Sequence, residues 1–170
     1  MAAPQHRRAP RAPRDCPCFS GQRYGACCAP YHRGESEAGR PVLLMRSRYA
    51  AFALGLGDYL VRTLAKSHPD LDLPREALVR ELSRAKERQR FMGLQILHEA
   101  ETGDEGEVMF FARIFEKGVD GSFVELSQFV REGTAWRYAS GIMVPKGDLP
   151  AEVSVDALTP ADIFALRSRE

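Results

Sequence analysis

The sequence has no long apolar run and no excess of charge of either sign. Its formal net charge is +1, from 24 Lys and Arg residues against 23 Asp and Glu residues. This balance gives the whole chain no electrostatic preference for nucleic acid or another highly charged partner. No apolar stretch approaches the ~20 residues of a membrane-spanning helix. No apolar run follows the basic start, as a secretory signal would require. We therefore expect a cytoplasmic protein.

Cysteine is scarce, and all of it lies in one short segment. The four cysteines are Cys16, Cys18, Cys27 and Cys28. In a reducing compartment such a cluster is more typical of a metal site than of disulfides. Thiolates suit zinc, and four of them around one ion leave no position open for a substrate. The sequence therefore predicts one structural Zn²⁺. A disulfide, a redox thiol pair and His32 as an alternative fourth ligand remain open.

Positive charge is concentrated at the start of the chain. Up to residue 34 the single acid is Asp15, and the arginines are Arg7, Arg8, Arg11, Arg14, Arg23 and Arg33. Residues 1–14 contain three prolines and no acid, a composition that predicts a disordered basic arm. Arginine makes forked contacts with phosphate or carboxylate. The arm could therefore contact nucleic acid or a ribosome, and the alternative is that it only keeps the terminus solvated.

Downstream, the apolar pattern changes from helical to alternating. Helices are expected over 41–54, 58–64 and 75–90, and strands over 93–100, 108–116, 122–131 and 135–141. Thr159 followed by Pro160 predicts the start of a short helix in the tail, residues 146–170. Three helices followed by a four-stranded meander predict an α+β domain over 41–145, with helices on one face of an antiparallel sheet.

The cysteine segment contains the pattern Cys16-Pro17-Cys18, Ser20-Gly21, Tyr24 and Cys27-Cys28. This pattern resembles the SEC-C motif, a zinc-binding module found at the carboxyl end of the SecA translocation ATPase, although Phe19 stands where the motif usually has Gly. The resemblance implies that residues 15–35 form a small zinc knuckle, called the cysteine knuckle below. It also implies a docking role toward a protein or ribosome-associated partner. The predicted docking face comprises Arg23, Tyr24, Tyr31 and His32.

Six later blocks of sequence form a second recognisable pattern: residues 44–52, 58–60, 91–94, 111–115, 125–129 and 136–141. Together these blocks resemble the YchJ-like (UPF0225) bacterial family. This resemblance implies a nuclear-transport-factor-2-like fold, in which a cone of sheet is wrapped by helices. It implies a fold and a metal, but it names no substrate.

A second site is predicted at the mouth of this cone. Alternation places Phe123, Glu125, Ser127 and Phe129 on one face of their strand. If the preceding hairpin turns about Val119, Arg113 lies opposite Glu125. A charged pair among aromatic side chains is costly unless it is matched. The pair is therefore either a structural salt bridge or the polar floor of a pocket. Further candidate pocket residues are Arg46, Tyr49, His68 and Ser127.

Three functions are compatible with these features. The first is a docking module that uses the cysteine knuckle. The second is a small-ligand-binding protein or enzyme that uses the cone pocket, with Glu125 or His68 as acid–base group. The third is metal storage or transfer, which a closed four-thiolate site disfavours. The sequence shows no nucleophile and base at recognisable spacing and no phosphate loop, so a binding protein is favoured over an enzyme.

Overall fold

The computed structural model describes residues 14–169. The predicted basic arm lies outside this range except for Arg14, which is exposed. The helices are α1 (Ala29–His32), α2 (Pro41–Leu54), α3 (Gly57–Arg62), α4 (Arg75–Ser83), α5 (Ala85–Arg88) and α6 (Pro160–Arg167). The strands are β1 (Gln89–Thr102), β2 (Glu105–Glu116), β3 (Val119–Asp120), β4 (Phe123–Glu132) and β5 (Ala135–Pro145). The short 3₁₀ turns are η1 (Tyr24–Ala26), η2 (Pro69–Asp72), η3 (Lys146–Asp148) and η4 (Val155–Ala157).

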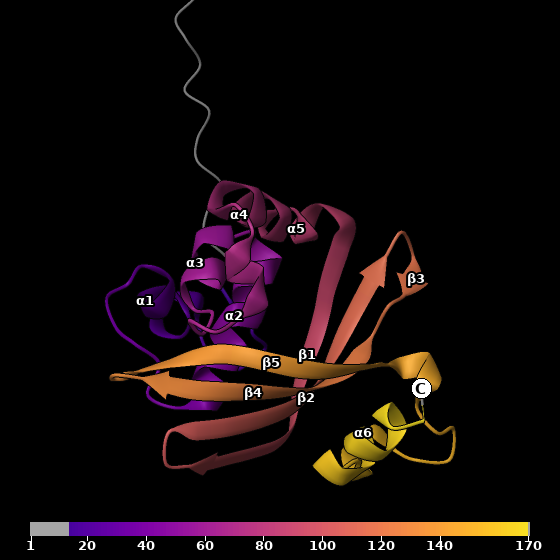
Figure 1. The fold of residues 1–170 in the computed structure, drawn as a ribbon. Helices are drawn as coiled ribbons and strands as arrows, with labels where there is room; N and C mark the ends of the chain where they lie inside the picture. The colour runs from indigo at the N-terminus through magenta and orange to yellow at the C-terminus, as the bar shows by residue number, and fades with distance from the viewer. Residues whose placement is uncertain (1–13, 170) are drawn as a thin grey trace, which may run out of the picture.

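The strands form one antiparallel sheet in the order β1-β2-β4-β5, and β3 pairs with the end of β2. Figure 1 shows α1 to α5 gathered on one side of this sheet and α6 on the other. The strand pairing shifts near Met92, Leu97 and Ala139. Such bulges bend a strand and increase its twist, so the sheet curls around the helices. The predicted α+β class is confirmed.

Helices pack against both faces of the sheet. On one face Leu44 and Tyr49 of α2 pack against Val108 and Trp136. On the other face Ile163 of α6 is fully buried in a cluster with strand residues. Burial of each large apolar side chain contributes roughly 1.5–3 kcal/mol. The sequence had predicted helices on one face only. The start of α6 is as predicted, because Thr159 forms a reciprocal capping box with Asp162.

The third predicted helix, 75–90, is shorter than expected. It is interrupted at Arg84, and α5 ends at Arg88. Residue 89 already pairs with Glu116 of β2. The good helix propensity of this charged segment is therefore overridden by pairing with a neighbouring strand.

The turn after β2 lies earlier than predicted. Lys117 and Gly118 both have a positive φ, of 51° and 77°, and they form the turn in place of a pivot about Val119. The register therefore pairs Phe110 with Glu125. A shift by an odd number of residues moves a side chain to the other face of the sheet. Arg113 consequently lies exposed on the face away from Glu125, and the predicted pairing of these two residues is wrong.

Within residues 14–169 the longest helix has 14 residues, and none combines the length and apolarity needed to cross a bilayer.

Candidate functional site

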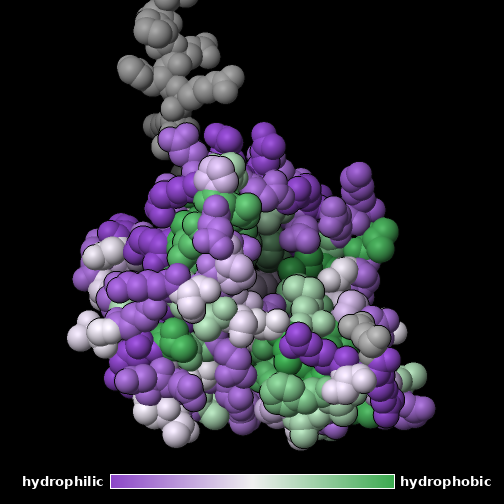
Figure 2. Space-filling model, viewed as in Figure 1, coloured by the Kyte–Doolittle hydropathy of each residue, from purple (hydrophilic) through white to green (hydrophobic). Residues whose placement is uncertain are grey.

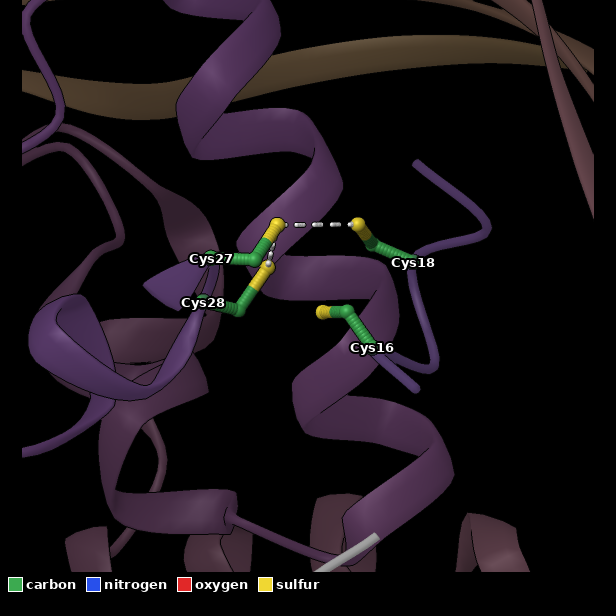
Figure 3. Close-up of side chains that lie close together, drawn as sticks. All are labelled: Cys16, Cys18, Cys27 and Cys28. Atoms are coloured by element: carbon green, nitrogen blue, oxygen red, sulfur yellow. Dashed lines mark hydrogen bonds between the residues drawn. The ribbon is translucent and has the colours of Figure 1, made fainter. Parts of the chain in front are cut away.

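The four cysteine side chains converge on one point beside α2. Their sulfur atoms all lie within 4.8 Å of one another, and Figure 3 shows them turned toward a common space. The Cys18 and Cys27 sulfurs are 3.6 Å apart, and those of Cys27 and Cys28 are 3.9 Å apart. Tetrahedral zinc with Zn–S bonds of about 2.3 Å separates its sulfurs by about 3.8 Å. The cluster therefore fits the dimensions of a four-thiolate metal site.

A tight loop presents the first two cysteines. The Cys16 amide donates to the Gln22 carbonyl at 2.9 Å and closes this loop. Phe19 has a φ of 59°, a left-handed conformation that costs a non-glycine residue about 1–2 kcal/mol. Its ring packs edge-on against Tyr49, with ring centroids 6.2 Å apart. Phe19 thus adopts the backbone conformation that favours Gly at this position of the motif, while its side chain contacts α2.

The thiols in the cluster interact strongly. The pKa of Cys18 lies far below the ordinary thiol value, chiefly because the Cys16 thiol and then the Cys28 thiol stabilise its thiolate. The same interaction with Cys18 is the main cause that raises the pKa of Cys16 to about 11. A divalent ion would supply the positive charge that several thiolates require.

Helix α2 fastens the cysteine knuckle to the sheet domain. Arg46 Nη1 donates to the Cys18 carbonyl at 2.9 Å, and the fully buried Ala50 packs against the cysteines. Arg46 therefore supports the cysteine loop. It does not line the cavity between the helices and the sheet, so its predicted place in the pocket is corrected.

His32 lies between the knuckle and the helices. Its Nδ1 is 2.7 Å from the Tyr24 hydroxyl, and its Nε2 is 2.8 Å from the Ser47 carbonyl. Burial lowers its pKa, so the ring is neutral and Nε2–H donates to the carbonyl while Nδ1 accepts from Tyr24. Both ring nitrogens thus have hydrogen-bond partners. Within the described residues, the four cysteines are the group whose ligand atoms lie close enough together to bind one metal ion.

The predicted docking face is therefore mostly turned inward. Tyr24, Tyr31 and His32 are half-buried, and Arg23 is exposed. Arg62 donates to the backbone carbonyls of Tyr31 and His32, which holds this segment against α3.

A cavity of about 310 Å³ opens between the helices and the sheet. Figure 2 shows apolar side chains between the helical layer and the strands, and a second apolar area around α6, with hydrophilic side chains over much of the rest of this face. Four of the predicted pocket residues line the cavity: Tyr49, His68, Glu125 and Ser127. Arg113 does not, because the strand register turns it to the other face of the sheet.

The cavity contains a carboxylate held by two hydroxyl groups. Glu125 Oε1 accepts hydrogen bonds from Ser127 Oγ and Tyr138 Oη, each at 2.8 Å. Burial raises the pKa of Tyr138, and the charge of Glu125 raises it further, so the phenol stays protonated and donates. A Cβ at Gly141 would lie 2.3 Å from Oε1, so the absence of a side chain there makes room for the pair.

The cation of this cavity was not among the residues predicted from the sequence. Arg48 is 8% exposed, and its Nη1 donates to the Leu60 carbonyl at 2.7 Å and to Thr63 Oγ1 at 2.6 Å. The guanidinium carbon lies 4.8 Å from the ring centroid of Tyr138. Burial lowers the pKa of Arg48 to about 10, so it remains charged at neutral pH. The sequence did contain a signal for Arg48. It lies three residues after Met45 and four before Phe52, so it belongs to the same face of the helix as these two apolar residues, which also line the cavity.

His68 forms part of the polar rim. Its Nδ1 accepts from the Asp70 amide at 3.2 Å, and its ring centroid is 5.7 Å from that of Tyr138. Asp70 lines the cavity beside it, so the rim contributes a second carboxylate.

A curled antiparallel sheet, helices packed over a cavity and a four-sulfur cluster define a class of protein, the nuclear-transport-factor-2-like proteins with a SEC-C-type cysteine cluster. The family model described as "YchJ, middle NTF2-like domain" matches residues 40–141. The chain belongs to the YchJ (UPF0225) family. The predicted family and fold are thereby confirmed.

Known relatives support this assignment. The UPF0225 protein YchJ of Shigella dysenteriae is 38% identical over 128 residues, which cover 74% of this chain and 81% of the relative. The solution structure of a SEC-C motif containing protein from Rhodopseudomonas palustris has a TM-score of 0.65 and 36% identity, covering 74% of this chain and 95% of its own. The crystal structure of a SEC-C motif containing protein from Psychrobacter arcticus has a TM-score of 0.60 and 25% identity, covering 85% and 84%.

Proposed function

We propose that this protein binds a small ligand in the cavity and that a structural zinc ion in the cysteine knuckle stabilises the cavity wall. The two faces of α2 carry this proposal. Arg46, Ser47 and Ala50 contact the knuckle, whereas Arg48 and Tyr49 line the cavity. Whatever holds the knuckle together therefore also positions one wall of the cavity.

Zinc is the metal that the four sulfurs favour. Thiolates are soft ligands, and zinc accepts four of them in tetrahedral geometry with no strain from d-electron preferences. Zinc binding requires reduced thiols, and a reducing compartment keeps them in that state. We therefore propose that the protein is cytoplasmic. Elemental analysis of freshly purified protein is expected to give one zinc per chain. Stoichiometric iron, or metal-free protein with four titratable thiols, would contradict this assignment.

The cavity is favoured as the functional site because it contains groups that are costly to desolvate. A buried cation and a half-buried carboxylate lower stability unless they are matched, and binding a ligand is one reason to retain them. A small-molecule screen by amide NMR tests this. Hits are expected to shift the cavity-facing residues of β4, Phe123, Glu125 and Ser127. Shifts confined to α6, or none, would contradict ligand binding in the cavity. Acid–base catalysis by Glu125 or His68 would require a substrate in the same place, so binding is the first test.

Docking through the knuckle is the second candidate function. Phe19 is 47% exposed and Arg23 is exposed, and the arginines of residues 1–14 precede them. Contacts to phosphate weaken steeply as salt rises. Cosedimentation with ribosomes at low and high salt tests this candidate. The full chain should bind more strongly than Arg23→Ala or a chain lacking residues 1–13. Equal binding by all three would contradict it.

A further inference from the structure

We propose that the cavity selects a small uncharged ligand with an aromatic ring and a polar group that both donates and accepts hydrogen bonds, such as a carboxamide. This inference rests on the proposed ligand-binding function and adds the chemical class of the ligand. Two charged side chains that line the cavity, Glu125 and Arg48, its walls and its size each restrict that class. The third charged lining residue, Asp70, lies at the rim with its side chain 49% exposed.

The first charged group, Glu125, has one oxygen available. Both hydroxyl donors, from Ser127 and Tyr138, go to Oε1. Oε2 has no hydrogen-bond partner among residues 14–169. In this part of the chain every fully buried side-chain nitrogen or oxygen has a hydrogen-bond partner. Since Oε2 has none, it is not fully buried, and Glu125 lines the cavity. An ionised carboxylate is an acceptor only. Oε2 therefore calls for an N–H or O–H group on the ligand.

The second charged group, Arg48, has donors available. Its Nη1 makes both of its protein hydrogen bonds, to Leu60 and Thr63. Over the described residues Nε and Nη2 have no acceptor, and they too are accessible, because no fully buried polar side-chain atom there lacks a partner. Arg48 also lines the cavity. A guanidinium has donors and no acceptor, so this side of the cavity calls for a carbonyl or another neutral acceptor.

The opposite signs of these groups disfavour a ligand with net charge. Arg48 and Glu125 are connected through Tyr138, whose ring lies under the guanidinium and whose hydroxyl donates to the carboxylate. An anion drawn to Arg48 would therefore meet the nearby carboxylate, and a cation drawn to Glu125 would meet the guanidinium. Charge repulsion is strong in a partly desolvated site. A neutral group that donates on one side and accepts on the other satisfies both residues.

The walls and the volume favour one aromatic ring. Phe110 and Phe123 line the cavity with their rings edge to face, at a centroid distance of 6.1 Å. Phe52 and Phe91 contribute from the helices and β1. Aromatic rings prefer such edge-to-face and offset partners. The volume of about 310 Å³ lies at the low end of the roughly 300–1,000 Å³ of ligand pockets, which suits a single ring with a short polar group.

Four probes, each with one benzene ring and a different polar group, separate the requirement for a neutral ligand from the requirement for a donor and an acceptor. They are phenylacetamide, which is neutral and both donates and accepts, phenylacetate, which is an anion, phenethylamine, which is a cation, and toluene, which has no polar group. Each is titrated into the full-length zinc-containing protein while the amide NMR signals of Phe123, Glu125 and Ser127 are followed. Phenylacetamide is expected to bind at least about tenfold more tightly than each of the others, equivalent to roughly 1.4 kcal/mol.

A pair of matched variants assigns the selectivity to Glu125. Glu125→Gln keeps the shape of the side chain but removes its charge, and it can present a donor in place of Oε2. It is expected to weaken phenylacetamide binding by about tenfold and to strengthen phenylacetate binding. Glu105→Gln makes the same change at an exposed position of the same sheet and should leave all four affinities unchanged.

The outcomes distinguish this inference from the proposal on which it rests. If no probe shifts the lining residues, ligand binding in the cavity is itself contradicted. If toluene or a charged probe binds most tightly, or if all four bind equally, the cavity binds small molecules but does not select a neutral ligand that donates and accepts. If Glu125→Gln leaves the order of affinities unchanged, Glu125 does not set the selectivity and the inference fails.

Discussion

The hydroxyl of Tyr138 donates a 2.8 Å hydrogen bond to Oε1 of Glu125, and this contact joins β5 to β4 at the floor of the cavity. The backbone of Tyr138 also pairs with the segment after α3, because its amide donates to Thr63 and its carbonyl accepts from Ala65. One tyrosine thus connects the sheet, the helical layer and the carboxylate of the candidate ligand site.

This contact predicts a perturbed tyrosine titration. Burial, followed by the charge of Glu125, raises the pKa of Tyr138 above its ordinary value of about 10. The associated contribution to stability is fully present below pH ~10 and is lost as pH rises through the folded-state pKa. Glu125→Gln should lower the pKa, since it removes the charge. Ultraviolet titration of each protein against its Tyr138→Phe counterpart isolates this tyrosine. An identical titration in wild type and Glu125→Gln would show that the two groups do not interact.

Gly141 makes the Tyr138–Glu125 contact sterically feasible. A Cβ there would lie 2.3 Å from Glu125 Oε1 and 2.5 Å from the Tyr138 hydroxyl oxygen. Gly141→Ala should therefore displace the pair, lower the free energy of unfolding by about 1–2 kcal/mol and lower the Tyr138 pKa. Gly147→Ala is the control, because nothing lies within 4 Å of a Cβ at that position. Equal denaturation midpoints for the two variants, with an unchanged tyrosine titration, would contradict the expected clash.

Metal removal should affect α2 as well as the cysteine loops. The knuckle has no apolar core of its own and packs on α2 and α3. Chelation is therefore expected to reduce hydrogen-exchange protection over residues 14–35 and near Arg46 and Ala50. Strands β4 and β5 should keep their protection, since they pair with each other along their length. Protection lost uniformly across the whole chain, or lost only from residues 14–35, would show that α2 does not respond in this way.

Arg46→Met should weaken metal retention while the cysteines stay in place. It removes the charged donor from the Cys18 carbonyl, a hydrogen bond of a kind that contributes about 1.5–3 kcal/mol. Competition with a chelator should show an affinity lowered by about tenfold or more. Arg80→Met is the control at an exposed helical position, and its metal affinity should equal that of the wild type.

Phe19 tests how the loop conformation affects stability. Its φ of 59° disfavours every residue with a Cβ, so Phe19→Gly should be more stable than Phe19→Ala by about 1 kcal/mol. Both variants lose the contact with Tyr49, and their difference therefore reports the backbone term alone. Chemical denaturation measures it, and an alanine variant at least as stable as the glycine variant would show that the loop has relaxed.

The amino-acid sequence alone determined the features that depend on local spacing. The four cysteines lie within residues 16–28, so their spacing and chemistry were enough to predict a shared site. The proline that begins α2, the glycine that ends it and the cap at Thr159 are likewise properties of a few adjacent residues. Such signals need no knowledge of distant segments.

Tertiary structure decided which of the polar residues meet. The turn at Lys117 and Gly118 set a strand register in which Arg113 lies away from Glu125. Side chains alternate between the two faces of a strand, so a register shift by an odd number of residues places Arg113 on the opposite face. Arg46 and Arg48 are two positions apart on α2, so they lie on opposite sides of the helix. Arg46 contacts the cysteine loop, and Arg48 lines the cavity. Which partner lies beyond each face depends on contacts between segments far apart in the chain, and a local pattern does not contain that information.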